Sequence, residues 1–327
     1  MQCALIEGFG NPADVVAPAE RPLPEPGAGE ARVRMTLSPI HNHDLAIVRG
    51  VYGYRPSLPA VPGTEAVGIV DALGDGVQGL RIGQRVATAS TNGVWAEHFI
   101  ATAAKLVPVP DALPDEAACQ LLAMPLSALM LLEDLRMAPG QWLVQNAANG
   151  AVGKVLATLA GIRGVHAVNL VRREAALADL EAAGIANGVC TEQAGWQQRV
   201  AAITGGAPIV RAVESIGGEA AQQLMSLLGE NGELVSFGSL TFKPLVIGAE
   251  QLIFKQTVVK GYWASKRLAA TPPAELARMI GELARLVIDG TLKLPVDAVF
   301  ELSQAAEAMS AAERVGRAGK VLLRGAA

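Results

Sequence analysis

The N-terminal part of the chain consists of short apolar runs separated by turn-forming stretches. The turns are rich in glycine and proline, as in residues 24–29 and 74–76, and the runs between them have high strand propensity. These features predict a β-rich first domain. Its expected strands are residues 3–7, 32–37, 66–72, 84–89 and 95–100.

From residue 115 onward, apolar segments of helical length alternate with short strand-like runs. A helix is predicted over residues 115–135, and a strand, a turn, a helix and a second strand follow between residues 142 and 171. Such alternation favours a parallel sheet with helices on both faces. The further expected strands are residues 188–190, 210–215, 233–237 and 257–261, and the further helices are residues 174–184 and 196–204.

The C-terminal tail leaves this alternation. It is expected to form a long helix, a strand, a helix and a last strand, at residues 273–290, 298–302, 304–314 and 320–323. The predicted fold class is therefore α/β, with a β-rich domain and a doubly wound parallel sheet.

The strand at residues 142–144 leads into a turn of small residues. Ala148, Gly150 and Gly153 occupy the three positions of a GxGxxG turn. In such a turn the first residue permits the bend, and the second lets backbone N–H groups approach a pyrophosphate. The third lets the following helix pack closely on the strand. The order of strand, turn, helix and strand predicts a dinucleotide-binding site.

Two arginines follow the second strand of this segment. About 20 residues after the turn, enzymes that use NAD carry an acid for the ribose 2′-hydroxyl, whereas a cation there accommodates the 2′-phosphate of NADP. Arg172 and Arg173 take this place, and guanidinium groups bind phosphate oxygens bidentately. We therefore predict NADP(H) as the cofactor. The alternative is a solvated arginine pair that Glu174 partly neutralises.

The length, net charge and apolar stretches of the chain indicate how many domains it has and which partners and locations are expected. The 327 residues are enough for about two domains with full cores. The net charge of −4 indicates no nucleic-acid partner. The most apolar stretch, residues 117–132, is interrupted by Gln120, Pro125 and Ser127, so no membrane span is expected. No secretory signal is visible, and we expect a cytoplasmic protein.

A set of motifs is distributed along the chain. They are VYGYRPSLPAVPGTEAVG from Val51, LVQNAANGAVG from Leu143, NLVRRE from Asn169, SFGSL from Ser236, LIFK from Leu252, KGYW from Lys260 and GRAGKVLL from Gly316. With these motifs the chain resembles the medium-chain dehydrogenase/reductase superfamily nearly end to end, and within it the enoyl thioester reductases of the mitochondrial type. The resemblance implies a GroES-like catalytic domain at residues 1–122 and 265–327, and a Rossmann NADP-binding domain at residues 123–264.

The resemblance also bears on metal use. Zinc-dependent members carry a Cys near a helix start, a His before the Glu of a GHE motif, and a further Cys or acid. The corresponding positions here are His41, Thr64 and the neighbourhood of Met124, so two of the three ligands are missing. We expect no metal. A conjugated enoyl or quinone substrate is then favoured over a plain ketone, because its carbonyl oxygen takes up the charge that hydride addition creates.

Addition of hydride to the β-carbon of an enoyl group leaves the α-carbon in need of a proton. Tyr52 lies in the loop at residues 50–56, where the resemblance places the catalytic tyrosine of the reductases, and a phenol can donate or relay a proton. Tyr54 is the competitor in the same loop. In the alternative interpretation both tyrosines only line the rim of a pocket.

The predicted function is NADPH-dependent, zinc-independent reduction of the C2=C3 double bond of a 2-enoyl thioester, carried by CoA or by acyl carrier protein. One alternative is a zinc-free NADPH:quinone or enone oxidoreductase of the same fold, and another is a non-catalytic NADP-binding scaffold. One position departs from the family: Met124 stands where the family carries an Asn.

The resemblance implies further cofactor contacts and a homodimer. The dimer would pair the exposed sheet edge near Val258 and Val259 across a two-fold axis. In the alternative interpretation these residues do not contact the cofactor: Phe237 and Trp263 pack in the core, and Lys320 is exposed at the surface. The implied contacts are Asn149, Gly150, Ala151 and Val152 at the pyrophosphate; Phe237, Gly238, Ser239 and Leu240 beside the nicotinamide; Tyr262, Trp263 and Ala264 next to the ring or the thioester; and Lys320 from the returning tail.

Overall fold

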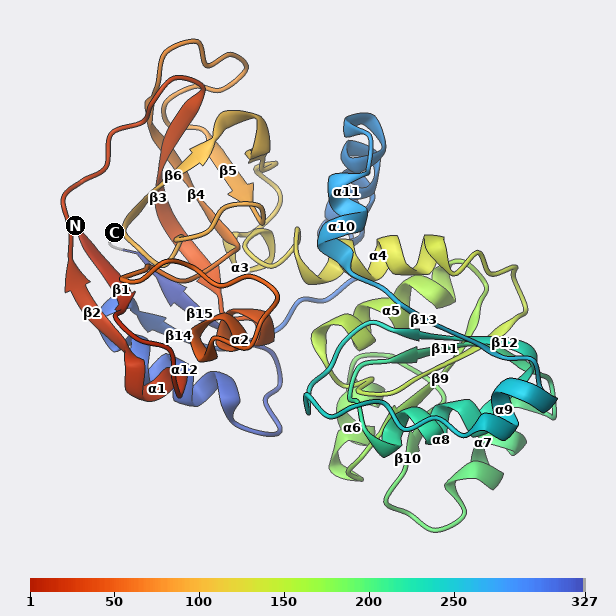
Figure 1. Ribbon diagram of the computed structural model, residues 1–327. Coiled ribbons are helices and arrows are strands. Elements are labelled where there is room, and N and C mark those ends of the chain that lie inside the picture. Colours follow the sequence, from red (N-terminus) through yellow and green to blue (C-terminus); the bar gives the residue numbers. More distant parts are fainter. Residues whose placement is uncertain (326–327) are drawn as a thin grey trace. The chain divides into compact units, whose positions relative to one another are not determined.

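The computed structural model describes residues 1–325 and divides into two compact units (Figure 1). The first unit contains Met1–Ala123 and the chain from Ile280 onward, and the second contains Met124–Met279. The sequence placed the return to the first domain earlier, at residue 265. In the structure, Arg267 holds the following segment on the second unit, because its guanidinium pairs with Asp134 at 3.1 Å and with Glu275 at 3.0 Å.

The first unit is built on a seven-stranded sheet of order β14-β15-β3-β4-β5-β7, with β6 also paired to β3, and on a separate hairpin of β1 and β2. Its central strand, β3, buries Ala31, Val33 and Met35 at alternate positions, as the period of two requires. The elements are β1 (Gln2–Ile6), α1 (Pro12–Val15), β2 (Val16–Glu20), β3 (Glu30–Pro39), α2 (Asn42–Arg49), β4 (Ala66–Leu73), β5 (Arg85–Thr88), β6 (His98–Thr102), η1 (Ala103–Lys105), β7 (Val107–Pro108), α3 (Asp115–Ala118), β14 (Val296–Glu301), η2 (Leu302–Gln304), α12 (Ala305–Glu313) and β15 (Lys320–Arg324).

The second unit contains a six-stranded sheet of order β10-β9-β8-β11-β12-β13, and all its pairs are parallel. In Figure 1, α4 and α8 lie on opposite sides of this sheet. The expected doubly wound sheet is thus confirmed. The elements are α4 (Met124–Asp134), β8 (Trp142–Gln145), α5 (Ala151–Ile162), β9 (His166–Val171), α6 (Ala175–Ala182), β10 (Gly188–Cys190), α7 (Trp196–Thr204), β11 (Ile209–Glu214), α8 (Glu219–Leu227), β12 (Leu228–Ser236), α9 (Ala249–Phe254), β13 (Val258–Gly261) and α10 (Ala264–Ala269); α11 (Pro273–Ile288) crosses from this unit to the first.

The continuous helix predicted over residues 115–135 is wrong. The structure contains two helices, α3 and α4, with a break between them. The backbone N–H groups of Leu122 and Ala123 donate to the buried carboxylate oxygen Oε1 of Glu65, at 2.6 and 2.9 Å, in place of helical carbonyl groups. A side chain distant in sequence therefore ends one helix before the next begins, which helical periodicity alone does not predict.

Candidate functional site

A cavity of about 780 Å³ opens at the carboxyl edge of the second unit's sheet. Asn146 and Ala147, which follow β8, line it together with the segment from Ile216 to Ala220, which follows β11. The chain order of the strands reverses between β8 and β11, and ligands of doubly wound sheets bind at such a switch point. This cavity is the candidate cofactor site.

The glycine turn has the close packing that its sequence predicted. A Cβ atom on Gly153 would lie 2.7 Å from the Cα atom of Ala148, so only glycine lets α5 begin this close to the turn. A Cβ on Gly150 would lie 3.1 Å from the carbonyl oxygen of Ala147. Gly150 is the N-cap residue of α5, and no side chain caps the first-turn N–H groups, which leaves them available to an anion. These features fit a dinucleotide pyrophosphate.

The two arginines after β9 have different surroundings. Arg172 lines the cavity and is exposed, and its guanidinium lies 3.8 Å from the carboxylate of Glu192. Arg173 is half-buried and is not among the lining residues. The acid beside Arg172 is thus Glu192, not the sequence neighbour Glu174. Arg172 fits the place of a 2′-phosphate ligand better than Arg173 does.

Of the residues that line this cavity, only Arg172 was a predicted site residue, and Thr191 and Lys243 are among those that the sequence analysis missed. Thr191 directly follows β10 and therefore stands at the carboxyl edge of the sheet, a position that the predicted strand could have indicated. Lys243 lies in a loop after β12 and adds a second cation to the cavity lining. Its loop has no pattern that places it there, so only the tertiary structure reveals this residue.

A buried acid, also missed, holds the loop after β11. The Glu214 carboxylate accepts hydrogen bonds from the backbone N–H groups of Ile216 at 2.7 Å and Gly217 at 2.6 Å. It also accepts one from the Asn146 side chain at 3.1 Å, and the Asn146 carbonyl oxygen accepts the N–H of Ser215 at 2.8 Å. These bonds tie the segments after β8 and β11 together, which fixes two walls of the cavity.

The residues predicted to lie near the nicotinamide are spread over several environments. The rings of Phe237 and Tyr262 stack with centroids 5.9 Å apart. The side chains of Leu240 and Trp263 are exposed. Gly238 lies against Ser215, Ser239 is exposed in the following loop, and Ala264 is the first residue of α10.

The residues predicted to contact the pyrophosphate lie at the glycine turn. The side chain of Asn149 donates a hydrogen bond to Asp179 of α6 at 2.8 Å, and Ala151 and Val152 form the first turn of α5.

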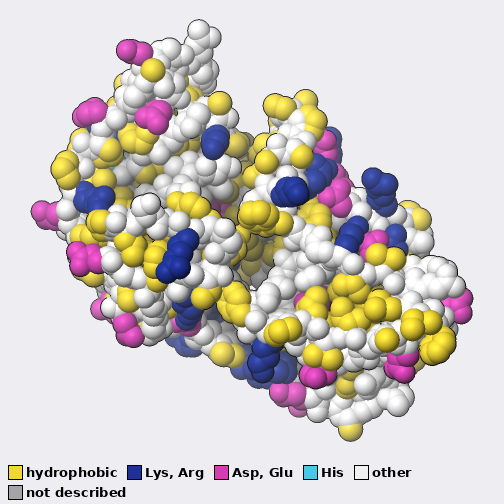
Figure 2. Space-filling view, viewed as in Figure 1, with side chains coloured by type: hydrophobic (Ala, Val, Ile, Leu, Met, Phe, Trp, Pro, Cys, Tyr) yellow, Lys and Arg dark blue, Asp and Glu magenta, His cyan; other side chains and the backbone are white. Residues whose placement is uncertain are grey.

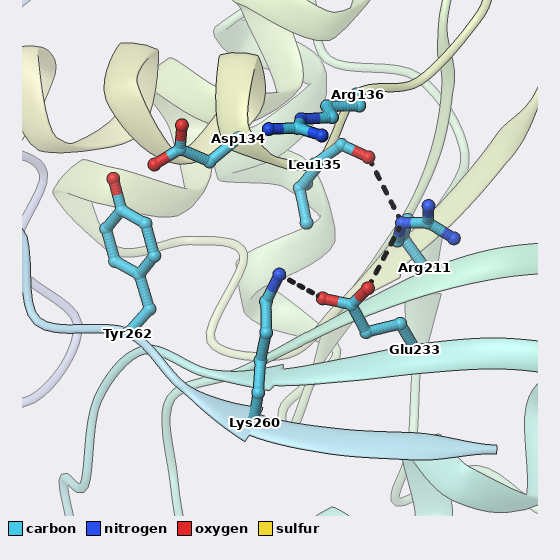
Figure 3. Close-up of a pocket in the computed structure, with 7 residues that line it drawn as sticks. All are labelled: Asp134, Leu135, Arg136, Arg211, Glu233, Lys260 and Tyr262. Atoms are coloured by element: carbon cyan, nitrogen blue, oxygen red, sulfur yellow. Dashed lines mark hydrogen bonds and ion pairs between the residues drawn. The ribbon is translucent and has the colours of Figure 1, made fainter.

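Tyr262 faces a second, charged pocket of about 490 Å³ in the same unit (Figure 3). Its hydroxyl points toward the Asp134 carboxylate at the end of α4, and burial, followed by the charge of Asp134, raises the pKa of the phenol. Lys260 and Arg211 pair with Glu233 across neighbouring strands. The charges in this pocket largely compensate one another. Tyr262 lines this charged pocket and does not line the cavity beside Arg172.

The first unit holds Tyr52 within a group of polar residues. The Tyr52 ring is half-buried and its centroid lies 5.8 Å from that of His43, whereas Tyr54 is exposed. Lys320, at the start of β15, is half-buried, so the alternative interpretation of an exposed lysine is wrong. Its Nζ donates to the carbonyl oxygen of Ile40 at 3.4 Å, and burial lowers its pKa to about 8.

His41 and Glu65 form a fully buried pair in the same group. The Nε2 atom of His41 lies 2.7 Å from the Glu65 carboxylate, and burial lowers the pKa of the imidazole and raises that of the carboxyl. Within residues 1–325, no three His, Cys, Asp or Glu side chains gather in a way that could hold a metal ion. The same residues include no helix long and apolar enough to cross a membrane.

A GroES-like unit combined with a doubly wound dinucleotide-binding unit defines the class of two-domain oxidoreductases. Two family descriptions match the chain: "Alcohol dehydrogenase GroES-like domain" over residues 27–111 and "Zinc-binding dehydrogenase" over residues 191–323. The chain belongs to the medium-chain dehydrogenase/reductase superfamily, as the sequence motifs predicted.

Curated relatives and solved structures support this membership. Mitochondrial enoyl-[acyl-carrier-protein] reductase of Bos taurus is 31% identical over 89% of this chain and 80% of its own length. The human enzyme of that name is 30% identical over 98% and 88%. Escherichia coli quinone oxidoreductase, solved with NADPH, is 25% identical with a TM-score of 0.90 over 99% of this chain and 100% of its own. A Bacillus thuringiensis protein provisionally named an NADPH:quinone reductase is 28% identical, with a TM-score of 0.92 over 99% of both chains.

Proposed function

We propose that this protein reduces the C2=C3 double bond of a 2-enoyl thioester, with Tyr52 as the proton donor to the α-carbon. The coarser statement follows from family membership: the protein is an NADP(H)-dependent oxidoreductase, and the predicted enzyme class and cofactor are confirmed. The curated relatives named above are enoyl reductases, which supports a thioester as the substrate.

The α5 N-terminus and Arg172 are the groups of this chain that would hold the cofactor. The uncapped N–H groups of α5 suit its pyrophosphate, and the Arg172 guanidinium suits its 2′-phosphate. When bound, NADPH supplies the hydride for the β-carbon. The Glu214 and Asn146 hydrogen bonds keep the cavity walls in place before the cofactor arrives.

The position of Tyr52 is the observation that carries the proposal. An enoyl thioester that has gained hydride carries negative charge on its α-carbon and thioester oxygen, and it needs an acid. Tyr52 is half-buried beside an imidazole, and Tyr54, the other tyrosine of the loop, is exposed. Tyr52 is therefore the better candidate for a hydroxyl that is held in one place.

Quinone reduction is the second candidate, because the solved structures named above are quinone reductases by name. The two reactions differ in where the proton goes. A reduced quinone takes its protons on oxygen, directly from water, whereas the enoyl α-carbon needs a positioned donor. A non-catalytic scaffold has less support, since the curated relatives are enzymes.

The test compares crotonyl-CoA with 1,4-benzoquinone as acceptors, followed by the loss of NADPH absorbance. We expect the wild-type protein to reduce crotonyl-CoA, and Tyr52→Phe to lower kcat about 100-fold or more, the usual contribution of a positioned acid. Tyr54→Phe, the matched control, should keep the rate. Turnover of benzoquinone alone would reject the thioester, and an unchanged rate in Tyr52→Phe would reject the proton-donor role.

The homodimer and the cytoplasmic location stay predictions. Exposed apolar side chains, including Ile253 and Phe254, cluster around α9, and Figure 2 shows hydrophobic side chains gathered on the second unit. This cluster supports a dimer. Val258 on the edge strand β13 is also exposed. The relatives named above are mitochondrial by name, so they add nothing to the expected location.

A further inference from the structure

A chain of buried and partly buried hydrogen bonds connects α2 with the loop before β4 in the first unit. The Thr64 hydroxyl donates to the Oδ1 atom of Asp44 at 2.7 Å, and the same Thr64 oxygen lies 2.7 Å from the Nε2 atom of His43. The other Asp44 oxygen accepts the backbone N–H of His41 at 2.9 Å and so caps α2. Asp44 is fully buried, so these bonds hold His43 in a single orientation.

The direction of these bonds defines the tautomer of His43. A hydroxyl has one hydrogen, and Thr64 gives it to Asp44, so the Thr64 oxygen must accept the hydrogen bond from His43. The Nε2 atom of His43 therefore carries the proton, and Nδ1 carries a lone pair. The imidazole side chain is 20% exposed, so it can exchange protons with water.

Several charged or titratable groups surround this imidazole. The Asp44 carboxylate lies 3.6 Å from Nε2, the His41 ring stacks on it at 5.0 Å, and the Tyr52 ring lies at 5.8 Å. Burial lowers the pKa of His43; the Asp44 charge opposes this shift and the charge of Lys320 adds to it. His43 is thus neutral at rest, and a new negative charge on Tyr52 would favour its protonated form.

We infer that His43 returns the proton to Tyr52 after Tyr52 has protonated the α-carbon, and that the Asp44–Thr64 pair aligns the imidazole for this transfer. This role rests on the proposed enoyl reduction. Tyr52 gives its hydroxyl proton to the α-carbon and becomes a phenolate. The Nδ1 atom of His43, which carries only a lone pair at rest, takes a proton from water as the negative charge forms on Tyr52, and the resulting imidazolium gives that proton to the phenolate. His43 returns to its neutral form, and one proton from water is consumed per turnover. His43 acts through Tyr52 and does not touch the substrate.

The test replaces His43 by Gln, whose amide N–H can still donate to Thr64 but which cannot carry a proton. We expect kcat for crotonyl-CoA to fall about 10-fold to 100-fold, with KM and the melting temperature unchanged and with a larger solvent deuterium isotope effect. His98→Gln, a histidine of the same unit that pairs with Asp71 at 3.2 Å, is the matched control and should behave as wild type. In His43→Ala, added imidazole should restore part of kcat.

The outcomes separate this role from the function on which it rests. A wild-type protein that fails to reduce crotonyl-CoA rejects the proposed function, and this role with it. If the wild-type protein is active and His43→Gln matches it, only the His43 role is rejected. A lower kcat accompanied by a lower melting temperature and no rescue by imidazole would assign His43 a structural role only, which also overturns the inference.

Discussion

The Arg172 guanidinium lies 3.8 Å from the Glu192 carboxylate, and both side chains line the cavity at the switch point of the second unit's sheet. Both are exposed, so the pair contributes little to stability, and the arginine remains free to bind another anion. The acid weakens the positive potential around Arg172 without removing it. We therefore expect the pair to tune the affinity for a phosphate at this place.

Replacement of Arg172 and Arg173 by Ala should raise the Kd for NADPH at least about tenfold and change that for NADH about twofold or less. Loss of a charge-assisted hydrogen bond costs about 1.5–3 kcal/mol, and about 1.4 kcal/mol corresponds to a factor of ten in Kd. Fluorescence titration of both cofactors measures the ratio. Arg136→Ala, an exposed arginine outside this cavity, is the control. Equal losses for the two cofactors would show that neither arginine recognises the 2′-phosphate.

Gly153→Ala should destabilise the second unit by about 1–3 kcal/mol and weaken NADPH binding. The new Cβ would lie 2.7 Å from the Ala148 backbone, so α5 must move away from the turn. Gly161→Ala in the same helix meets nothing within 4 Å and should stabilise by about 0.5–1 kcal/mol. Urea unfolding of the three proteins gives the comparison. A Gly153→Ala protein as stable as Gly161→Ala would contradict this account of the turn.

Lys320→Met should show how the buried lysine affects stability as the pH changes. The folded-state pKa of Lys320, about 8, is lower than the ordinary value for lysine, so the unfolded chain binds more protons between these two values. The wild-type free energy of unfolding should therefore rise relative to that of the variant between about pH 8 and pH 10, and the difference should be constant below pH 7. Urea unfolding at several pH values measures this. A difference independent of pH would mean that burial does not perturb the amine.

Val258→Lys should convert the expected homodimer to a monomer. Val258 is exposed on β13, the edge strand of its sheet, and a lysine on an edge strand opposes pairing with a second copy. Size-exclusion chromatography with light scattering gives the mass. Val315→Lys, at an exposed apolar residue of the first unit, should leave the mass unchanged. A wild-type monomer would reject the dimer, and a Val258→Lys dimer would reject this edge as its interface.

Much of the fold could be predicted because its signals are local. The strand at Gly188–Cys190 and the helix at Trp196–Thr204 have the predicted bounds, since strand propensity and helical periodicity agree there with the tertiary packing. The helix α8 and the strand β2 were missed. The break before α4 was also missed, because it depends on Glu65, which lies far away in sequence. The fold class and the superfamily were predicted correctly.

The candidate site could be predicted only in part. The turn from Ala148 to Gly153 is a local motif, and its close packing follows from residue size alone. Lys243 and Glu214 could not be found in this way. Lys243 lines the cavity from a loop, and Glu214, at the end of β11, acts through hydrogen bonds to the loop that follows, so both roles depend on tertiary contacts. Tyr52 was identified by resemblance, and its catalytic role stays a prediction.

The amino-acid sequence alone predicted the alternation of strands and helices, the dinucleotide turn and the preference for NADP(H), because these depend on periodicity, residue size and charge along the chain. Its motifs indicated the superfamily by resemblance. Only the tertiary structure decided which arginine lines the cavity, which acid lies beside it, and that His43 lies next to Tyr52 with its tautomer defined by Thr64 and Asp44. Hydrogen-bond direction and burial arise when segments distant in sequence meet, and these properties control how a proton moves.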